Sequence, residues 1–416
     1  MLTINTTRFK DTFACLTRDG ATEAGGLNRP ALSLNHLAAR QTFREMIDAG
    51  GFELLEDGAG NLSARWTCNQ SGAQTLMLGS HLDSVPEGGR FDGTLGVAAA
   101  FEVLHVLRES KLDLCMNLEV MDFTDEEGTW ISLWGSRALT GQLSAREFAN
   151  PRGNPAEFQA QLARAGLTQE GSLSASREND PFAGYLELHI EQGTRLEKAQ
   201  AQIGVVTGVV GIHMFLVTFH GTANHAGTTP MDERRDAAQG AAAFCQAVRK
   251  RTMASFADCV ATVGRMDFTP GAFNIIPERV TVFMELRSDD DKRAGELEGA
   301  LREEAAQAAR EHSLDLDFDH LETVESRAMD LDLCRTIEAA ADGLNLSYRR
   351  LLSLAGHDAQ NMALLCPAGL LFVPSIGGYS HSAREYTRWE DCVAGANTLL
   401  NTAHAFALNM PKVLQV

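Results

Sequence analysis

Short apolar runs that end in clusters of polar residues are the feature of this sequence that most constrains its fold. Residues 75–78 lead into G-S-H-L-D, residues 117–123 end in T-D-E-E-G, and residues 185–190 end in H-I-E-Q-G. Each run has the character of a buried strand, and 94–107 has the pattern of a buried helix. Strands that alternate with helices and carry polar residues at their carboxyl ends are typical of an open α/β sheet. The pattern therefore predicts an α/β fold with a site along that edge.

A second pattern occupies residues 210–324. The predicted elements follow the order βαββαβ, typical of a ferredoxin-like unit: strand 211–220, helix 235–251, strands 259–267 and 279–288, helix 291–312 and strand 314–322. Alternating α/β character then resumes, with helices predicted at 331–343, 357–366 and 389–409 and a strand at 370–373. A chain of 416 residues is also long for a single core. We therefore predict a first domain made of 1–209 and 325–416, with 210–324 inserted as a second domain.

Charge and composition argue against several classes of protein. The formal net charge of −19 argues against nucleic acid and anionic membrane as partners. No apolar run approaches the roughly 18 residues of a membrane span, and the N-terminus lacks the charged-then-apolar order of a signal peptide. The eight cysteines are scattered without a C-x-x-C pair, which argues against a zinc ribbon. The polar, Ser- and Asn-rich stretch 150–180 is expected to lie on the surface. We expect a cytoplasmic protein, and the net charge says little about its substrate because a local arginine can override the global field.

Histidines and carboxylates recur where the predicted strands end. The set consists of His81, Asp92, Glu126, Glu127, His189 and His381. Two histidines and two carboxylates, with one carboxylate shared, could hold a pair of divalent ions about 3.5–4 Å apart. Imidazole together with carboxylate favours zinc, with manganese, cobalt or nickel as alternatives. Because adjacent side chains on a strand point in opposite directions, one of the two neighbouring glutamates could bind metal while the other takes a proton from water.

Each of these residues also has an ordinary interpretation when it is considered alone. A single histidine is more often a core or surface residue than a ligand, and adjacent acids usually form a solvated turn. The remaining histidines outside the recognisable motifs receive that interpretation: His36, His105, His213, His220, His312, His320 and His404. What separates the chosen set is its joint placement at strand ends, beside glycine or serine.

Eight motifs in order give the chain a family resemblance. They are G-S-H-L-D-S-V-P-E-G-G-R-F-D-G-T-L-G-V, F-T-D-E-E-G, G-S-R-A-L-T-G, L-E-L-H-I-E-Q-G, N-H-A-G-T-T-P-M, A-F-N-I-I-P, A-G-H-D-A and G-Y-S-H-S. Together they resemble the amidase/hydantoinase-carbamoylase branch of the aminoacylase-type dinuclear metallopeptidases. That branch includes N-carbamoyl-L-amino acid hydrolases, β-ureidopropionases and allantoate amidohydrolases. The resemblance covers nearly the whole chain. It implies an open mixed-sheet catalytic domain of the zinc-exopeptidase type, with an inserted ferredoxin-like dimerisation and lid domain.

The resemblance implies how the candidate ligands would share two metal ions. Asp92 would bridge the two divalent ions. One ion would also be bound by His81 and His189, and the other by Glu127 and His381. This arrangement uses every candidate ligand of the set except one glutamate, which is left for catalysis.

The same resemblance assigns residues to catalysis and substrate binding. Glu126 would be the general base, and Asp83 would orient the imidazole of His81, as partners of metal-bound histidines commonly do. The implied substrate-binding residues are Gln192, His225, Asn274, Arg287 and His357. His225 would donate to the oxyanion of the tetrahedral intermediate, and Arg287 would hold a substrate carboxylate through its planar guanidinium. Without the resemblance, Arg287 would be interpreted as an arginine on the solvent face of a strand.

Two further implications concern assembly and the departures from the family pattern. The inserted domain dimerises in this family and can close over the site, so a homodimer is implied. Thr129, Trp130 and Ile131 follow D-E-E-G where arginine and phenylalanine are usual, and Thr194 and Ala383 replace usual prolines. None of these changes removes a ligand. Trp130 lies just beyond the two glutamates, and we interpret it as a residue that reshapes the substrate pocket.

The sequence therefore predicts a dinuclear metal-dependent amidohydrolase. It would hydrolyse the C–N bond of an N-carbamoyl group on an L-amino acid or ureido acid, giving the amino acid, carbon dioxide and ammonia. Alternative substrates within the same branch are allantoate, ureidoglycolate and N-acyl amino acids. A more distant alternative is a non-catalytic binding protein on the same scaffold. Such proteins usually lose a ligand or the base, whereas this chain has all of them.

Overall fold

The chain folds into two compact units. The computed structural model describes residues 1–112 and 114–409. Unit 1 combines Met1–Thr207 with the chain from Ala328 onward, and unit 2 is Gly208–Arg327. The segment predicted as an insertion, 210–324, begins two residues after the start of unit 2 and ends three residues before its end. We propose that this segment is the inserted domain.

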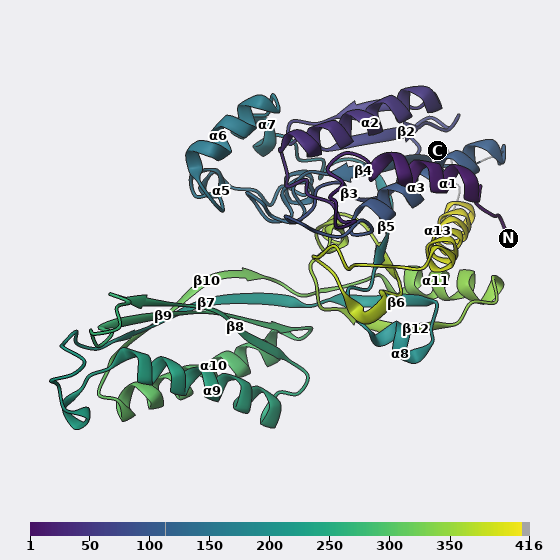
Figure 1. The fold of residues 1–416 in the computed structure, drawn as a ribbon. Coiled ribbons are helices and arrows are strands. Elements are labelled where there is room, and N and C mark those ends of the chain that lie inside the picture. Colours follow the sequence, from purple (N-terminus) through teal and green to yellow (C-terminus); the bar gives the residue numbers. More distant parts are fainter. Residues whose placement is uncertain (113, 410–416) are drawn as a thin grey trace. The chain divides into compact units, whose positions relative to one another are not determined.

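Unit 1 contains a mixed sheet of nine strands in the order β1-β2-β4-β3-β5-β13-β6-β11, with β12 paired to β6 (Figure 1). The strands are β1 (Glu53–Glu56), β2 (Leu62–Trp66), β3 (Thr75–His81), β4 (Asn117–Phe123), β5 (Phe182–Ile190), β6 (Ile203–Val209), β11 (Arg327–Ala328), β12 (Tyr348–Ser353) and β13 (Ala368–Val373). The four neighbours β4, β3, β5 and β13 run parallel, and β2 and β6 flank them antiparallel. The parallel strands are buried along their whole length, which is why they appear in the sequence as continuous apolar runs.

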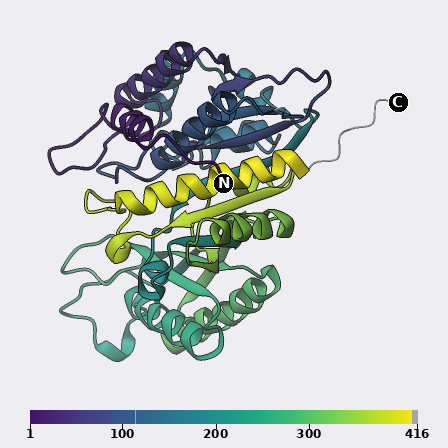
Figure 2. The same cartoon turned by 90° about the vertical axis from the view of Figure 1, so that its right-hand side faces the viewer.

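Helices pack on this sheet and supply the rest of the unit 1 core. They are α1 (Thr6–Leu16), α2 (Leu34–Gly50), α3 (Thr94–Glu109), α4 (Trp134–Leu139), α5 (Ala145–Ala149), α6 (Pro155–Arg164), α7 (Gln169–Leu173), α8 (Arg195–Ala199), α11 (Leu331–Gly343), α12 (Asp358–Met362), α13 (Trp389–Asn409) and the 3-10 helix η2 (Ile376–Gly378). α3 is apolar on nearly every side because it packs on β3 and β5 and also contacts α1 and α13. α13, the yellow helix of Figure 2, packs on α3, α11 and β13.

Unit 2 is an antiparallel sheet with two helices on one face (Figure 1). Its elements are β7 (Gly211–His220), η1 (Met231–Glu233), α9 (Ala237–Ser255), β8 (Val260–Thr269), β9 (Arg279–Ser288), α10 (Asp291–Glu311) and β10 (Asp315–Val324). The strand order β10-β7-β9-β8 places the first strand between the fourth and the third, the ferredoxin-like arrangement. Alternate residues of β9 are buried against the helices, beginning with Val280 and Val282.

The predicted fold class is confirmed, and most predicted elements lie where the pattern placed them. The predictions for 117–123, 211–220, 279–288, 331–343 and 389–409 agree with the structure residue for residue. The stretch 150–180 is mostly exposed, as predicted, but α6 and α7 lie within it and Phe158 of α6 is fully buried among other aromatic residues. None of the helices in the described ranges is long and apolar enough to cross a membrane.

Candidate metal centre

Three neighbouring parallel strands deliver candidate ligands to one edge of the unit 1 sheet. β3 ends at His81, which is in register with Phe123, the last residue of β4. The turn after β4 carries Glu126 and Glu127, and His189 is the penultimate residue of β5. Because the carboxyl ends of parallel strands meet at one edge, side chains distant in sequence become neighbours there. The predicted placement of these residues at strand ends is confirmed.

Asp92 reaches the same edge because the chain turns sharply before α3. Gly93 precedes the helix with φ +62°, a left-handed conformation that favours glycine. A Cβ atom at Gly93 would also lie 2.4 Å from the ring of His81. Glycine is therefore required both for the backbone conformation and for space. Its presence lets the Asp92 carboxylate lie against the histidine rings.

His81 and His189 are held in the tautomer of a metal ligand. Nδ1 of His81 lies 3.1 Å from the carbonyl oxygen of Asp83, and Nδ1 of His189 lies 3.0 Å from that of Ile190. A carbonyl oxygen only accepts, so each Nδ1 carries the proton and each Nε2 of the neutral ring presents a lone pair. The Nε2 atoms of His81 and His189 lie 3.4 and 3.1 Å from Oδ1 of Asp92. Three electron-rich atoms therefore converge on one point.

A second set of ligand atoms faces the other oxygen of Asp92. Nε2 of His381 lies 3.6 Å from Oδ2 of Asp92 and 3.3 Å from Oε2 of Glu127. His381 lies in the loop after β13 with φ +52°, and its side chain is half exposed. Asp92 itself is buried. Its carboxylate therefore stands between two histidines on one side and a histidine–glutamate pair on the other.

This geometry fits two cations that share the Asp92 carboxylate. His81, Asp92 and His189 offer ligand atoms within 4.8 Å of one another, and so do Asp92, Glu127 and His381. Nε2 of His81 and Oε1 of Glu127 are buried and have no hydrogen-bond partner among the described residues. Buried polar atoms of this kind are costly unless something neutralises them. The nitrogen and oxygen donors suit zinc, manganese, cobalt or nickel.

The electrostatics of the cluster favour added positive charge. Burial opposes protonation of His81 and His189, yet the surrounding carboxylates raise the pKa of both rings above the ordinary value. Burial also raises the pKa of Glu126 and Glu127 well above that of a free glutamate, and repulsion from neighbouring carboxylates adds to the rise. The cluster therefore binds protons tightly, and divalent cations would relieve the same excess of negative charge.

Asp83 holds the turn of Glu126 and Glu127 more closely than it holds His81. Its two carboxylate oxygens accept the backbone N–H groups of Glu126 and Glu127, each at 3.2 Å. Its Oδ1 lies 3.6 Å from Nδ1 of His81, farther than its own carbonyl oxygen at 3.1 Å. The contact that orients the imidazole thus comes mainly from the backbone of Asp83, and its carboxylate positions the two glutamates.

Two predicted substrate-binding residues of unit 1 lie beside the cluster. Nε2 of Gln192 donates to Oδ2 of Asp92 at 2.9 Å and to Oγ of Ser380 at 3.2 Å. The buried ring of His357 lies 4.5 Å from the ring of His189, measured between centroids. Gln192 thus contacts one candidate ligand and His357 packs against another. Their contact with substrate stays a prediction.

The other predicted substrate-binding residues lie at two ends of the unit 2 sheet. The loops after β7 and before β9 pair through His225 and Ile275, and the N–H of Ala226 donates to the carbonyl of Asn274 at 3.0 Å. Backbone pairing therefore brings His225 and Asn274 side by side. Arg287 lies eight residues beyond the first residue of β9, roughly 27 Å farther along the strand. The structure does not bring Arg287 to the other two within this unit.

His225 has the opposite tautomer to His81 and His189. Its Nδ1 accepts the backbone N–H groups of Gly227 at 3.0 Å and Thr228 at 3.2 Å. An accepting Nδ1 leaves the proton of the neutral ring on Nε2. Because the residue is exposed, this Nε2–H group is a hydrogen-bond donor within reach of a ligand.

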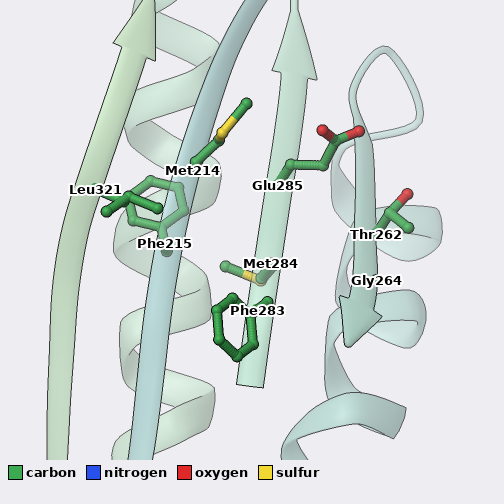
Figure 3. A pocket seen from close by; sticks show the side chains of 8 residues that line it. All are labelled: Met214, Phe215, Thr262, Gly264, Phe283, Met284, Glu285 and Leu321. Carbon is green, nitrogen blue, oxygen red and sulfur yellow. The ribbon is translucent and has the colours of Figure 1, made fainter. Parts of the chain in front are cut away.

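Arg287 lies beside a groove on the outer face of the unit 2 sheet. Its Nε donates to Oε1 of Glu285 at 2.9 Å. The groove has a volume of about 340 Å³ (Figure 3), and its lining residues are Met214, Phe215, Thr262, Gly264, Phe283, Met284, Glu285 and Leu321. Glu285 is the one charged residue of that lining. A substrate carboxylate would therefore compete with Glu285 for the guanidinium of Arg287.

Trp130 is a core residue, so the interpretation that it reshapes the pocket is wrong. Its side chain is buried, its Nε1 donates to the carbonyl oxygen of Ala31 at 3.1 Å, and its ring lies 5.3 Å from that of Phe158. The backbone N–H of Trp130 is held by the carboxylate of Asp125 at 2.9 Å. The turn after the glutamates thus directs this side chain into the core.

Sequence reasoning missed several buried carboxylates near the candidate ligands, among them Glu187, Glu385 and Asp122. Glu385, four residues after His381, accepts the backbone N–H of Asp92 at 3.1 Å. Asp122, in β4, pairs with Nε of the buried Arg40 at 3.0 Å. The available signals were an acid soon after a candidate histidine and a charged residue within an apolar strand. Neither signal says which distant residue the carboxylate contacts.

Known proteins are similar to this chain in sequence and in fold over most of its length. The model of peptidase family M20/M25/M40 matches residues 77–405. The chain is 33% identical over 390 residues to the N-carbamoyl-L-amino acid amidohydrolase of Geobacillus stearothermophilus, covering 93% of this chain and 95% of that protein. It is 31% identical over 395 residues to the allantoate amidohydrolase of Escherichia coli (strain K12), covering 94% and 95%. The crystal structure of an amidase of the hydantoinase/carbamoylase family from Burkholderia multivorans matches with a TM-score of 0.87 at 31% identity, covering 97% and 98%.

These matches agree with the observed fold. The chain therefore belongs to peptidase family M20/M25/M40, in its hydantoinase/carbamoylase amidase branch. The resemblance inferred from the eight motifs is confirmed at the level of the family and the fold. The roles of individual residues stay predictions.

Proposed function

We propose that this protein is a metal-dependent amidohydrolase that cleaves the C–N bond of an N-carbamoyl group on an L-amino acid or ureido acid. The observation that carries the proposal is the convergence of three histidine Nε2 atoms on the two oxygens of Asp92. Relatives named for N-carbamoyl-L-amino acids and for allantoate support a small linear substrate of this kind. The allantoate relative, at nearly the same identity, makes allantoate the second candidate substrate.

The candidate ligands would hold two divalent metal ions. When bound, the ions would activate the substrate carbonyl and the attacking water as Lewis acids. His81 and His189 would hold one ion and Glu127 and His381 the other, with Asp92 shared. Backbone carbonyls hold the rings of His81 and His189 with Nε2 facing Asp92, so these ligands need little rearrangement.

Glu126 would transfer the proton of the attacking water. Its Oε2 lies 3.6 Å from Nε2 of His81, and its side chain is 10% exposed. Burial raises the pKa of Glu126 well above the ordinary value, which makes its carboxylate a stronger base than that of a free glutamate. Glu126 would accept a proton from the attacking water and pass it to the leaving nitrogen. One water is consumed, and an N-carbamoyl amino acid yields the amino acid, carbon dioxide and ammonia.

Groups of unit 2 would complete substrate recognition. The Nε2–H of His225 would donate to the oxyanion, and Arg287 would bind the carboxylate. Because Arg287 lies roughly 27 Å along β9 from its first residue, and the His225 loop pairs with the segment before β9, one small substrate would not contact both in a single copy of unit 2. If both contact the substrate, one of them comes from a second copy of the chain. This separation supports the proposed homodimer.

The central experiment compares wild type with Glu126→Gln after metal removal and refilling with Mn²⁺, Co²⁺ or Zn²⁺. N-carbamoyl amino acids, allantoate, ureidoglycolate and N-acetyl amino acids are assayed side by side. We expect the metal to restore activity of the wild type, with N-carbamoyl amino acids preferred. Glu126→Gln should bind the same number of ions but lose roughly 10²–10⁴-fold in kcat. Glu178→Gln, at an exposed position, is the matched control.

Two results would overturn parts of this proposal. Wild-type activity in Glu126→Gln would remove the general base from the mechanism. Turnover of allantoate or N-acetyl amino acids alone would replace the proposed substrate and leave the metal chemistry standing.

Subunit mixing tests the contribution of a second copy. His225→Ala and Arg287→Ala are each mixed with Glu126→Gln, all inactive alone. If one residue acts across the dimer, its mixture should regain roughly a quarter of wild-type activity, because half of the dimers are mixed and each has one intact site. If neither mixture regains activity, the two-copy proposal is wrong.

A further inference from the structure

Glu385 is a buried carboxylate that joins two parts of the candidate site. The residue is 6% exposed and lies four residues after His381. Its Oε1 accepts the backbone N–H groups of Phe91 at 2.9 Å and Asp92 at 3.1 Å. Glu385 and Asp92 are 293 residues apart in the sequence. One carboxylate therefore ties the loop of His381 to the turn that carries Asp92.

The second oxygen of Glu385 reaches the side chain of Asp92 through Ser380. Oε2 of Glu385 lies 3.0 Å from Oγ of Ser380, which lies 3.1 Å from Oδ2 of Asp92. The hydroxyl has one proton for two carboxylates, and Gln192 supplies a further donor to Oδ2 of Asp92 at 2.9 Å. Asp92 is thus held at its backbone N–H and at Oδ2, while Oδ1 faces the two buried histidines.

The chain leaves room for this contact at Gly89. A Cβ atom at Gly89 would lie 1.9 Å from Cδ and from Oε1 of Glu385. No left-handed φ requires a glycine at this position, so space is the reason for it. A side chain at Gly89 would push the carboxylate away from the N–H groups that it accepts. Gly89 therefore offers a way to disturb Glu385 without changing it.

We propose that Glu385 is a positioning residue that orients the Asp92 carboxylate so that its two oxygens serve two metal sites at once. The inference rests on the proposed function, in which Asp92 is the shared ligand. Glu385 acts through the backbone of Asp92 and through Ser380. Its loss should therefore weaken both metal sites together, whereas loss of His189 or His381 should weaken one.

Titration of Mn²⁺ into metal-stripped protein, followed by calorimetry, tests the proposal directly. The variants are Glu385→Gln, Glu385→Ala and Gly89→Ala, and Glu390→Gln, an exposed acid in the first turn of α13, is the control. Wild type and control should bind two Mn²⁺ ions with the same affinities. The three variants should bind both ions about 10–100-fold more weakly. Glu385→Gln should lose least, because its amide oxygen can still accept the two N–H groups.

Activity at different Mn²⁺ concentrations adds a readout that a merely structural role would not move. Because the expected defect is in metal binding, millimolar Mn²⁺ should restore most of the kcat of Glu385→Gln, with KM unchanged. Glu126→Gln should stay inactive at every Mn²⁺ concentration, since its defect is in proton transfer.

Unchanged Mn²⁺ affinity in Glu385→Gln, or weakening of one ion alone, would overturn the inference, whatever the variant does to the unfolding temperature. If Glu385→Ala fails to fold, Glu385→Gln and Gly89→Ala still decide the question. Failure of the proposed function has a different signature. In that case wild-type protein itself would bind no Mn²⁺ or hydrolyse none of the substrates.

Discussion

Two candidate ligands of unit 1, His81 and His189, carry their ring protons on the opposite nitrogen from His225 of unit 2. In unit 1, Nδ1 of His81 and of His189 faces a backbone carbonyl, and the bare Nε2 atoms face Asp92. In unit 2, Nδ1 of His225 accepts two backbone N–H groups, and Nε2–H faces outward. The same type of side chain can therefore bind a metal through Nε2 in one unit and donate a hydrogen bond from Nε2 in the other. The backbone group that meets Nδ1 makes the difference.

Burial separates the two units in the same way. The carboxylates and histidines at the edge of the unit 1 sheet are mostly buried and crowded, so they need a cation. His225 and Asn274 are exposed, so solvent can satisfy their polar groups without a cation. Substitutions of the candidate ligands in unit 1 should therefore change metal binding, and substitution of His225 in unit 2 should change turnover alone.

The largest effect is expected from His189→Gln. Gln lacks the Nε2 lone pair that faces Asp92, so one metal site should be lost. Activity should fall by more than about 1000-fold, beyond the roughly 10–100-fold that loss of an outer contact costs. Elemental analysis after refilling with Mn²⁺, together with the hydrolysis assay, checks this. Two ions per chain and normal activity would contradict the ligand assignment.

His225→Ala should separate turnover from metal binding. The variant removes an oxyanion donor, so kcat should fall roughly 10²–10³-fold. Its Mn²⁺ content and affinity should match the wild type, because His225 supplies none of the candidate ligand atoms. Steady-state kinetics gives kcat, and calorimetry on the same preparation gives the Mn²⁺ affinity. A loss of metal would break the comparison between the units.

The buried histidine of α2 should make the stability of unit 1 depend on pH. Burial lowers the pKa of His36 to about 3, and the charge of Arg40 adds to the effect. An unfolded histidine titrates near 6.5, so between these values the unfolded chain binds a proton that the folded chain does not. Stability is therefore present above about pH 6.5 and lost as the pH falls, by about 2 kcal/mol between pH 7 and pH 5. No histidine in unit 2 is buried.

Tryptophan fluorescence measures this loss in unit 1 alone, because all four tryptophans belong to unit 1. Denaturant unfolding at pH 7 and pH 5 is compared for wild type and His36→Asn. The asparagine oxygen can still accept the N–H that Leu32 donates to Nδ1, but it does not titrate. The variant should lose about 2 kcal/mol less than the wild type. Equal losses would show that His36 does not contribute.

The smallest effects contrast a buried and an exposed aromatic residue. Trp130→Phe leaves the carbonyl of Ala31 without its donor, which should lower the free energy of unfolding by about 1–3 kcal/mol. KM should not change, because Trp130 lies in the core. Phe273→Ser, at a fully exposed position of unit 2, should change stability by less than about 0.5 kcal/mol. Denaturant unfolding followed by circular dichroism compares the two.

Hydrophobic periodicity predicted most of the strands and helices, because each produces a recognisable pattern within a few residues. β4 and β9 were predicted to the residue, since one is a continuous apolar run and the other alternates. The helices within 150–180 were not predicted, because most of their residues are polar and the one buried aromatic residue, Phe158, gives no clear periodicity. The family resemblance was recognisable because its motifs are short and lie in order along the chain.

The candidate ligands could be proposed because they lie at or near the ends of predicted strands or the start of a predicted helix, and most of them are next to glycine or serine. The contacts that surround these ligands could not be predicted from the sequence. The carboxylate of Asp83 accepts N–H groups more than 40 residues away, and that of Glu385 accepts one 293 residues away. Trp130 was misassigned for the same reason, since its place in the core depends on Ala31 and Phe158. Such contacts depend on where distant segments meet, which no local pattern records.

Local pattern was thus enough to establish an α/β chain with an inserted βαββαβ segment and a cluster of potential metal ligands. Strand and helix periodicity and turn residues depend on neighbours in the sequence, so they can be predicted from the sequence. The tautomers of His81 and His225, and the hold of Glu385 on Asp92, arise from backbone groups that folding brings into place. A hydrogen bond depends on fractions of an ångström between segments far apart in the chain, and only the packed molecule sets those distances.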